Sequence, residues 1–222
     1  MHGAAFVFFR WPTNNLLSMP AESFVDFFIP PAKILIMSVE QPAYETLKQD
    51  GSFEVRRYNG YVLAHVDVEA DFDTALNEGF RALFGYITGH NRVRTKVPLT
   101  MPATGEVGER TETIPMTVPV IMEPRREGVY RVGFIMPGRY TLETLPRPDN
   151  ESIGFTEIPD HKVAVIRFSG HSHEPKVREK IGELKDWLRG NDLEPKSSFR
   201  LARYDPPWIP GFLRHNEIMV DV

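Results

Sequence analysis

Residues 61–89, YVLAHVDVEADFDTALNEGFRALFGYITG, decide the fold of this chain: an alternating apolar segment, a short acidic turn and a strongly amphipathic segment. In the last of these, apolar residues recur at the 3, 4, 7, 8 spacing of one helix face. Asp71 or Asp73 can accept a hydrogen bond from a free backbone N–H at the start, and Gly89 allows a left-handed stop at the end. The pattern predicts a helix whose buried face carries Phe72, Ala75, Leu76, Gly79, Phe80, Leu83, Phe84 and Ile87.

The segment before this helix has the period of a half-buried strand. One face carries Val62, Ala64, Val66 and Val68, whereas the other carries Tyr61, Leu63, His65 and Asp67. Residues 52–58 (SFEVRRY) also alternate, and Asn59-Gly60 is a strong two-residue turn signal. We therefore expect residues 52–58 and 61–68 to form an antiparallel hairpin. Arg56 and Arg57 could attract an anion, but we favour a solvated strand face for both.

The same plan returns 101 residues later, where residues 162–169 (KVAVIRFS) align with residues 61–68. A second helix follows, with Val177, Ile181, Leu184 and Leu188 inward, and ends at Gly190. The pattern predicts two copies of a strand and helix unit, at about residues 44–136 and 153–222. Further strands are expected at residues 129–136, 153–158, 199–204 and 217–222.

Two proline-rich phrases follow the first helix, VPLTMP at 97–102 and IPMTVP at 114–119. Prolines four apart exclude a central strand with a full ladder and favour bulged or edge pairing. Residues 205–212 (DPPWIPGF) are unusually apolar for a connection. This loop either covers the core or forms the wall of a ligand site, and the sequence leaves both open.

Composition narrows the range of functions. The 222 residues can bury a full core, and a net charge of -4 without a basic cluster argues against a nucleic-acid partner. The absence of cysteine removes disulfides, thiolate metal sites and cysteine nucleophiles. The sequence does not indicate an oligomeric state.

The first 37 residues read differently from the rest. A short apolar run at 6–9 is closed by Arg10 and Pro12, well short of the ~20 residues of a membrane span. Residues 23–37 are also apolar, but charges and prolines interrupt them and no cleavage site frames them. We expect an extension outside the fold, residues 1–37, before a single domain at 38–222 in a cytoplasmic protein. An exported or anchored form, or a start codon misassigned upstream of Met37, are the alternatives.

Eight phrases, taken together and in order, resemble the SOUL haem-binding protein family in its bacterial and archaeal form. The resemblance covers residues 38–222 and implies an α+β fold, in which a duplicated βαββ unit makes a curved antiparallel sheet or distorted barrel with two packed helices. The phrases are SVEQPAYE (38–45), FEVRRY (53–58), IPMTVPV (114–120), FIMP (134–137), YTLETLP (140–146), FSG (168–170), YDPPW (204–208) and RHNE (214–217).

The resemblance also implies a function, which is reversible binding of haem or another tetrapyrrole in an apolar surface cleft beside the first helix. In the family, basic side chains lie near the propionates and a firm iron ligand is often missing. Mammalian haem-binding members carry arginine and lysine at two helix positions where this chain has Asn77 and Gly85. Arg57 stands where one branch has a proposed axial histidine. The cleft implied for this chain comprises Asn77, Phe80, Arg81, Phe84, Met116, Trp208, Phe212 and Arg214.

Several candidate residues have a simpler interpretation. The helical spacing of Phe80 and Phe84 fits core packing better than a ligand wall. Met116 could offer a thioether to iron, but a gap-filling role is favoured. His171 and His173 could hold a metal together, yet no third ligand is evident. For them we favour a solvated helix entry, with Ser172 as its cap.

The sequence contains no nucleophile elbow, zinc-protease motif, P-loop or dinucleotide fingerprint. The first hypothesis is therefore a non-catalytic carrier or buffer for haem or a related tetrapyrrole. The second is an effector-binding domain for hydrophobic cations or other amphiphiles, which an acidic Glu in the cleft would favour. The third is a tetrapyrrole-modifying enzyme. Glu54, Glu157 and Glu217 lie on different strands, so only coordinates decide whether two carboxylates converge.

Overall fold

Strands alternate with two helices in the computed structural model, which describes residues 39–93, 110–206 and 208–222. The expected N-terminal extension and the phrase at 97–102 lie outside the described residues. Neither α-helix within these ranges has the length and hydrophobicity of a membrane span. The elements are β1 (Tyr44–Asp50), β2 (Phe53–Tyr58), β3 (Tyr61–Glu69), α1 (Phe72–Ile87), β4 (Asn91–Arg92), β5 (Val120–Arg126), β6 (Val129–Ile135), β7 (Arg147–Pro148), β8 (Gly154–Ile158), β9 (His161–Ser169), α2 (Glu174–Gly190), β10 (Arg200–Arg203), the 3-10 turn η2 (Gly211–Leu213) and β11 (His215–Asp221).

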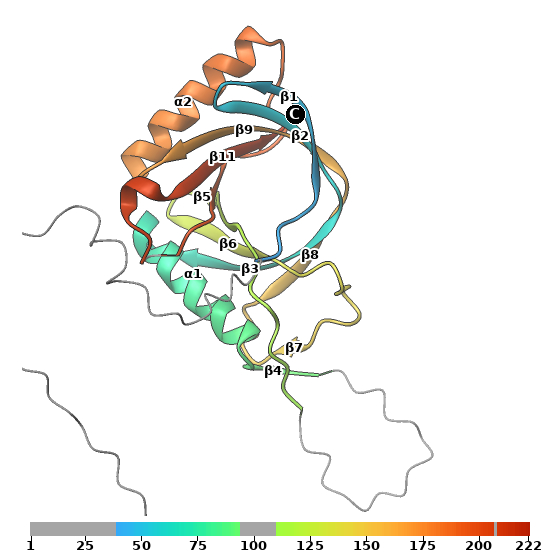
Figure 1. Ribbon diagram of the computed structural model, residues 1–222. Helices are drawn as coiled ribbons and strands as arrows, with labels where there is room; N and C mark the ends of the chain where they lie inside the picture. The colour runs from blue at the N-terminus through green and yellow to red at the C-terminus, as the bar shows by residue number, and fades with distance from the viewer. Residues whose placement is uncertain (1–38, 94–109, 207) are drawn as a thin grey trace, which may run out of the picture. The chain divides into compact units, whose positions relative to one another are not determined.

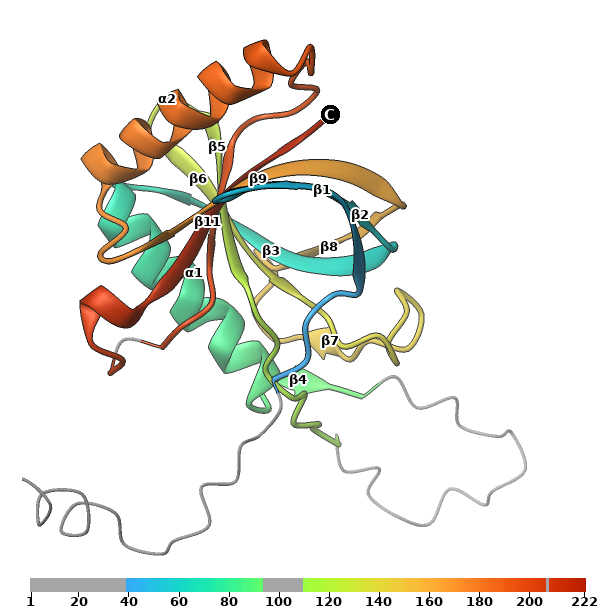
Figure 2. The ribbon, with the colours of Figure 1, turned by 45° about the horizontal axis from the view of Figure 1, so that its top comes forward.

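In the described ranges, nine strands form one sheet in the order β1-β2-β9-β11-β10-β5-β6-β3-β8, with every neighbouring pair antiparallel. Figures 1 and 2 show that the sheet curls strongly and that both helices lie against its outer face. α1 packs on β3 and β6, and α2 packs on β9 and β11. The predicted α+β fold with a curved antiparallel sheet and two packed helices is confirmed.

The two faces of β3 are divided as predicted. Val62, Ala64 and Val66 are buried in the main core beneath the helices, whereas Tyr61 and Leu63 are half-buried on the other face. Because side chains alternate along a strand, that other face looks into the curled sheet. The sheet therefore has an outer face covered by helices and an inner face enclosed by its own curvature.

α1 begins as predicted, because Asp71 is its N-cap and accepts a hydrogen bond from the backbone N–H of Thr74 at 3.0 Å. The predicted burial of Phe84 is wrong, since this side chain is 43% exposed. Tyr86, which the prediction omitted, is fully buried on the opposite flank. The buried stripe is thus centred near Leu83, and Phe84 lies ~100° around the helix from it.

The predicted hairpin between β2 and β3 is wrong. β2 pairs with β1 and β9, whereas β3 pairs with β6 and β8. At Asn59-Gly60 the chain instead crosses from one half of the sheet to the other, and the N–H of Gly60 donates to Asp160 Oδ1 at 2.6 Å. Asp160 lies in the corresponding turn between β8 and β9. Turn residues set the local bend, but strands distant in sequence supplied the pairing partners.

Apart from β1, the strand order is symmetric between the two halves of the chain. Strands in equivalent positions are β2 and β8, β3 and β9, β5 and β10, and β6 and β11. The helices are equivalent in the same way, and β1 has no counterpart. This equivalence is what a duplicated βαββ unit would produce. The duplication itself stays a prediction.

Equivalent positions in the two halves are 100 residues apart in the sequence, and the proposed offset of 101 residues is wrong. Tyr58 pairs with His161 and Ile158 pairs with Tyr61, so the two crossover pairs coincide only when 100 is added. An offset of 101 would match Val62, in the core under the helices, with a valine on the inner face. A slip of one residue exchanges the two faces of a strand, so weak identity alone did not fix the register.

The ends of α2 also differ from expectation. Its N-cap is His173, which makes no side-chain capping bond, and the proposed cap Ser172 is buried before the helix starts. Gly190 is the last helical residue, and the left-handed position falls on Asp192, with φ of 54°. Residues 114–119 do not form a regular strand, as their prolines predicted. Within the described residues, this segment makes a single isolated β-bridge, from Thr117 to Glu40.

Gly79 provides a test of the packing of α1 on the sheet. A Cβ at Gly79 would lie 2.5 Å from Val132 Cβ, and Val132 is fully buried in β6. We predict that Gly79→Ala lowers the free energy of unfolding by about 1–3 kcal/mol, although alanine is the better helix former. Gly182→Ala in α2, where no atom lies within 4 Å, is the matched control and should be neutral or stabilising by about 0.5–1 kcal/mol. Urea unfolding followed by circular dichroism measures both, and equal effects would contradict the close contact.

Candidate functional site

The inner face of the sheet holds a buried charged cluster centred on Arg56, which is 1% exposed. Its Nη1 and Nη2 donate to the carboxylate of Glu217 at 2.9 and 2.8 Å, and its Nε donates to Glu54 at 2.6 Å. The predicted solvated position of Arg56 is therefore wrong, because the curl of the sheet encloses the face that a flat sheet would expose. Arg57, on the opposite side of the strand, is exposed and pairs with Glu45.

Glu217 is the acceptor at the centre of this cluster. Tyr204 donates its hydroxyl to Oε2 at 2.7 Å, and His215 Nε2 lies 3.0 Å from Oε1 while its ring stacks on Tyr204. Burial by itself would raise the pKa of Glu217, but hydrogen bonds from His215 and Arg56 and the charge of Arg56 lower it to about 2. The carboxylates of Glu54 and Glu217 do converge, and both form ion pairs with arginine side chains. Glu157 lies apart from them and is exposed on β8.

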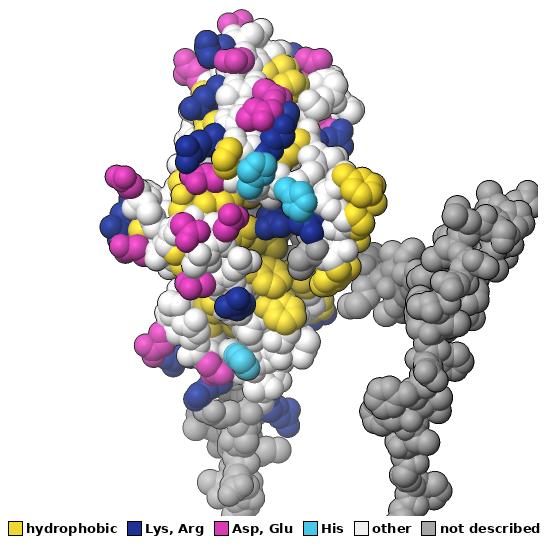
Figure 3. Space-filling view, turned by 90° about the vertical axis from the view of Figure 1, so that its left-hand side faces the viewer, with side chains coloured by type: hydrophobic (Ala, Val, Ile, Leu, Met, Phe, Trp, Pro, Cys, Tyr) yellow, Lys and Arg dark blue, Asp and Glu magenta, His cyan; other side chains and the backbone are white. Residues whose placement is uncertain are grey.

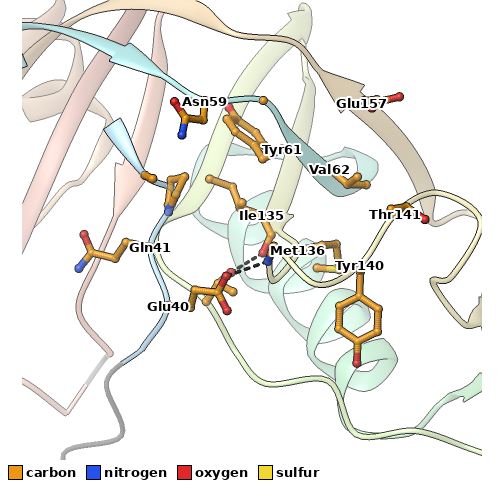
Figure 4. A pocket seen from close by; sticks show the side chains of 15 residues that line it. Glu40, Gln41, Asn59, Tyr61, Val62, Ile135, Met136, Tyr140, Thr141 and Glu157 are labelled. Carbon is orange, nitrogen blue, oxygen red and sulfur yellow. Dashed lines mark hydrogen bonds between the residues drawn. The ribbon is translucent and has the colours of Figure 1, made fainter. Parts of the chain in front are cut away.

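Two cavities accompany the inner face. The larger, about 340 Å³, lies where the chain enters β1 and crosses into β3, and Figure 4 shows its lining. Glu40 at its edge accepts the N–H of Gly138 at 2.7 Å, and Tyr140 donates to Glu112 at 2.6 Å. The second, about 220 Å³, shares Tyr61 with the first and is lined by charged residues of β5 and β6. None of the residues predicted for the cleft lines either cavity.

Four of the predicted cleft residues lie along the exposed side of α1. Asn77, Arg81 and Phe84 are exposed, and Phe80 is half-buried. The rings of Phe80 and Phe84 stack with their centroids 5.7 Å apart and their planes 14° apart. Phe80 also meets the core residue Phe134 edge-on at 5.5 Å. The two phenylalanines thus form an apolar strip that begins in the core and ends in solvent.

The loop before β11 contributes the next predicted residues. Trp208 is 79% exposed and Phe212 is 75% exposed, so their side chains do not cover the core. Arg214 is half-buried, and its Nε donates to the carbonyl of Ile209 at 2.8 Å. Both ribbon views place this loop beside α1. Figure 3 looks onto this side of the molecule, where hydrophobic side chains gather next to basic and histidine side chains.

Met116 packs against the main core cluster, in agreement with its predicted gap-filling role. His171 and His173 are exposed, and the imidazole of His171 lies directly against Gly211 at the start of η2, where it leaves no room for a Cβ. Among the residues that the structure describes, no group of three or more His, Asp or Glu side chains is placed to hold a metal ion.

Sequence reasoning missed Arg203. It lies on β10, two residues from the core residue Leu201 and therefore on the same, helix-covered face. Burial lowers the pKa of Arg203, the positive charge of Arg214 lowers it further, and Asp73 of α1 acts in the opposite direction. The alternation in residues 199–204 already placed an arginine on the apolar face of a strand, and this was the available signal.

A family model described as "SOUL heme-binding protein" matches residues 39–221. The chain belongs to the SOUL family. The resemblance proposed from the eight phrases is thereby confirmed, and the match spans the whole described fold.

Curated relatives of this SOUL protein carry matching names. "Heme-binding protein 2" of Mus musculus is 28% identical over 178 residues, which cover 77% of this chain and 80% of the mouse protein. "Heme-binding protein 2" of Homo sapiens is 27% identical over 188 residues, covering 82% and 85% respectively. Among solved structures, the C-terminal domain of EcmrR matches with a TM-score of 0.53 at 12% identity, covering 80% of this chain and 96% of that domain. That likeness shows a shared fold.

The pKa of Glu217 leads to a prediction about acid stability. A carboxyl group whose folded pKa lies below its ordinary value of 4.5 stabilises the fold above that value, and this contribution disappears as the pH falls toward about 2. We expect the free energy of unfolding to lose on the order of 3 kcal/mol from this group over that interval. Urea titrations at several pH values measure the loss. Glu217→Gln should remove this part of the pH dependence, whereas exposed Glu157→Gln should keep it; a wild-type profile in Glu217→Gln would contradict the assignment.

Proposed function

We propose that this SOUL protein binds haem or a related tetrapyrrole reversibly, as a non-catalytic carrier or buffer, on the surface between α1 and the loop at 205–214. The observation that carries the proposal is the stacked pair Phe80 and Phe84, whose outer member is 43% exposed. A flat macrocycle can lie against such rings, and the exposed side chains of Trp208 and Phe212 lie on the adjacent loop. The names of the curated relatives support the same ligand class.

The residues here fit a porphyrin held through its apolar surface and its acid groups. Each 100 Å² of apolar surface covered contributes about 2.5 kcal/mol, from which the cost of association must be subtracted. An open surface of a few aromatic side chains therefore suits reversible binding. Basic side chains at Arg203 and Arg214 stand beside it for the propionates. When bound, haem supplies an iron that a carrier protein need only hold and release.

The other two hypotheses receive less support. A hydrophobic cation needs an accessible acidic group, whereas the surface proposed here presents Arg203 and Arg214. Glu40 and Glu157 line the larger cavity, which none of the predicted cleft residues lines. For an enzyme, the two carboxylates that converge, Glu54 and Glu217, are both held by arginines and are not free to act as acid or base. The structural likeness to the EcmrR domain concerns the fold and adds no ligand to this protein.

Haem titration followed by absorbance tests the proposal. We expect a shifted Soret band that saturates near one equivalent, and Phe84→Ala should weaken binding about 10-fold because it removes half of the exposed stack. Trp208→Ala should act in the same direction. Leu142→Ala, which truncates an exposed apolar side chain on the connector between β6 and β7, is the control and should bind as the wild type does. A spectrum equal to that of free haem in buffer would refute the function, and an unchanged affinity in both Phe84→Ala and Trp208→Ala would refute the location.

A further inference from the structure

Arg203 stands out among the charged residues of the described chain. It is half-buried on the helix-covered face of β10, and within the described residues its guanidinium makes no hydrogen bond or ion pair. The carboxylate of Asp73 is near enough to act on its charge but does not form an ion pair with it. A partly buried cation without a partner is unfavourable, because desolvation is not offset by a bound anion.

Strand pairing places a second arginine next to it. Arg203 lies opposite Asn216 of β11, and Arg214 is two residues before Asn216, on the same face. The backbone pairing continues beyond the strand end, since Tyr204 N–H donates to the carbonyl of His215 at 3.3 Å. Diagonal neighbours of this kind are roughly 7–8 Å apart. Two like charges at this separation repel each other, and an anion between them would offset this repulsion.

The same pairing connects Arg203 with the aromatic strip. Arg203 lies opposite Val120 of β5, and Val120 lies opposite Phe134 of β6, whose ring touches Phe80. Two strand spacings separate Arg203 from Phe134, which is roughly 10 Å. The helices pack on the strands to either side, α1 on β3 and β6 and α2 on β9 and β11. The arginine and the apolar strip therefore belong to one surface between the two helices.

We propose that Arg203 and Arg214 form an anion-receiving pair, so that this surface selects flat amphiphiles bearing carboxylate groups and rejects hydrophobic cations. The inference rests on the proposed function and assigns Arg203 as a specificity-determining residue at that site. A carboxylate would receive charge-assisted hydrogen bonds from the pair, while the apolar body of the ligand covers Phe80 and Phe84. A cation would add a third positive charge at the same place.

Three probes separate charge from shape: haem, its dimethyl ester, in which both propionates are neutral, and the hydrophobic cation tetraphenylphosphonium. We expect the wild-type protein to bind haem about 10-fold to 100-fold more tightly than the ester, and not to bind the cation. Arg203→Gln should weaken haem binding by a similar factor and leave ester binding unchanged. Arg189→Gln, at an exposed ion pair on α2, removes the same charge elsewhere and should leave all three affinities unchanged.

A stability measurement distinguishes ligand selection from a structural role. Because Arg203 has no partner in the described fold, Arg203→Gln should leave the melting temperature of the ligand-free protein unchanged or raise it. A large decrease would mean that the guanidinium supports the fold, and would overturn the inference. Equal affinity of the wild type for haem and its ester would overturn it without any variant, while the proposed function would stand. Binding of neither porphyrin would refute both.

Discussion

Each half of this protein completes the sheet of the other, and the rest of the structure depends on this exchange. β2 of the first half pairs with β9 of the second, and β8 of the second pairs with β3 of the first. The two crossover turns meet where the N–H of Gly60 donates to Asp160. Since each half has its outer strand beside the other half, neither half contains a complete sheet by itself.

The curl that follows from this exchange gives the sheet two buried faces. The outer face is a conventional apolar core under two helices. The inner face is too narrow to be solvated like an open surface and is partly filled by Arg56, Glu54 and Glu217, which satisfy one another. Removing one member of such a cluster would leave an uncompensated buried charge, so these residues define the interior of the fold rather than a reactive centre.

The opposite situation holds on the outer face, between the helices. α1 and α2 lie over the strands on either side of β10 and β5, and the exposed loop before β11 borders the same region. There the protein leaves aromatic side chains in solvent and, as far as the described residues show, Arg203 unpaired. The charges of the inner face are thus paired with one another, whereas Arg203 on the outer face is half-buried and has no partner among the described residues.

The sequence by itself determined both helices, most of the strands, the family and the two faces of β3, because hydrophobic period, capping residues and turn residues act within a few positions of one another; it did not predict β1 or β5. It located α1 and the apolar loop, and the resemblance supplied the candidate residues on both. Only the tertiary structure decided the strand partners, the one-residue register between the halves, the burial of Arg56 and the exposure of Phe84. These depend on contacts between residues far apart in the chain and on the curvature of the whole sheet, and no local pattern encodes either.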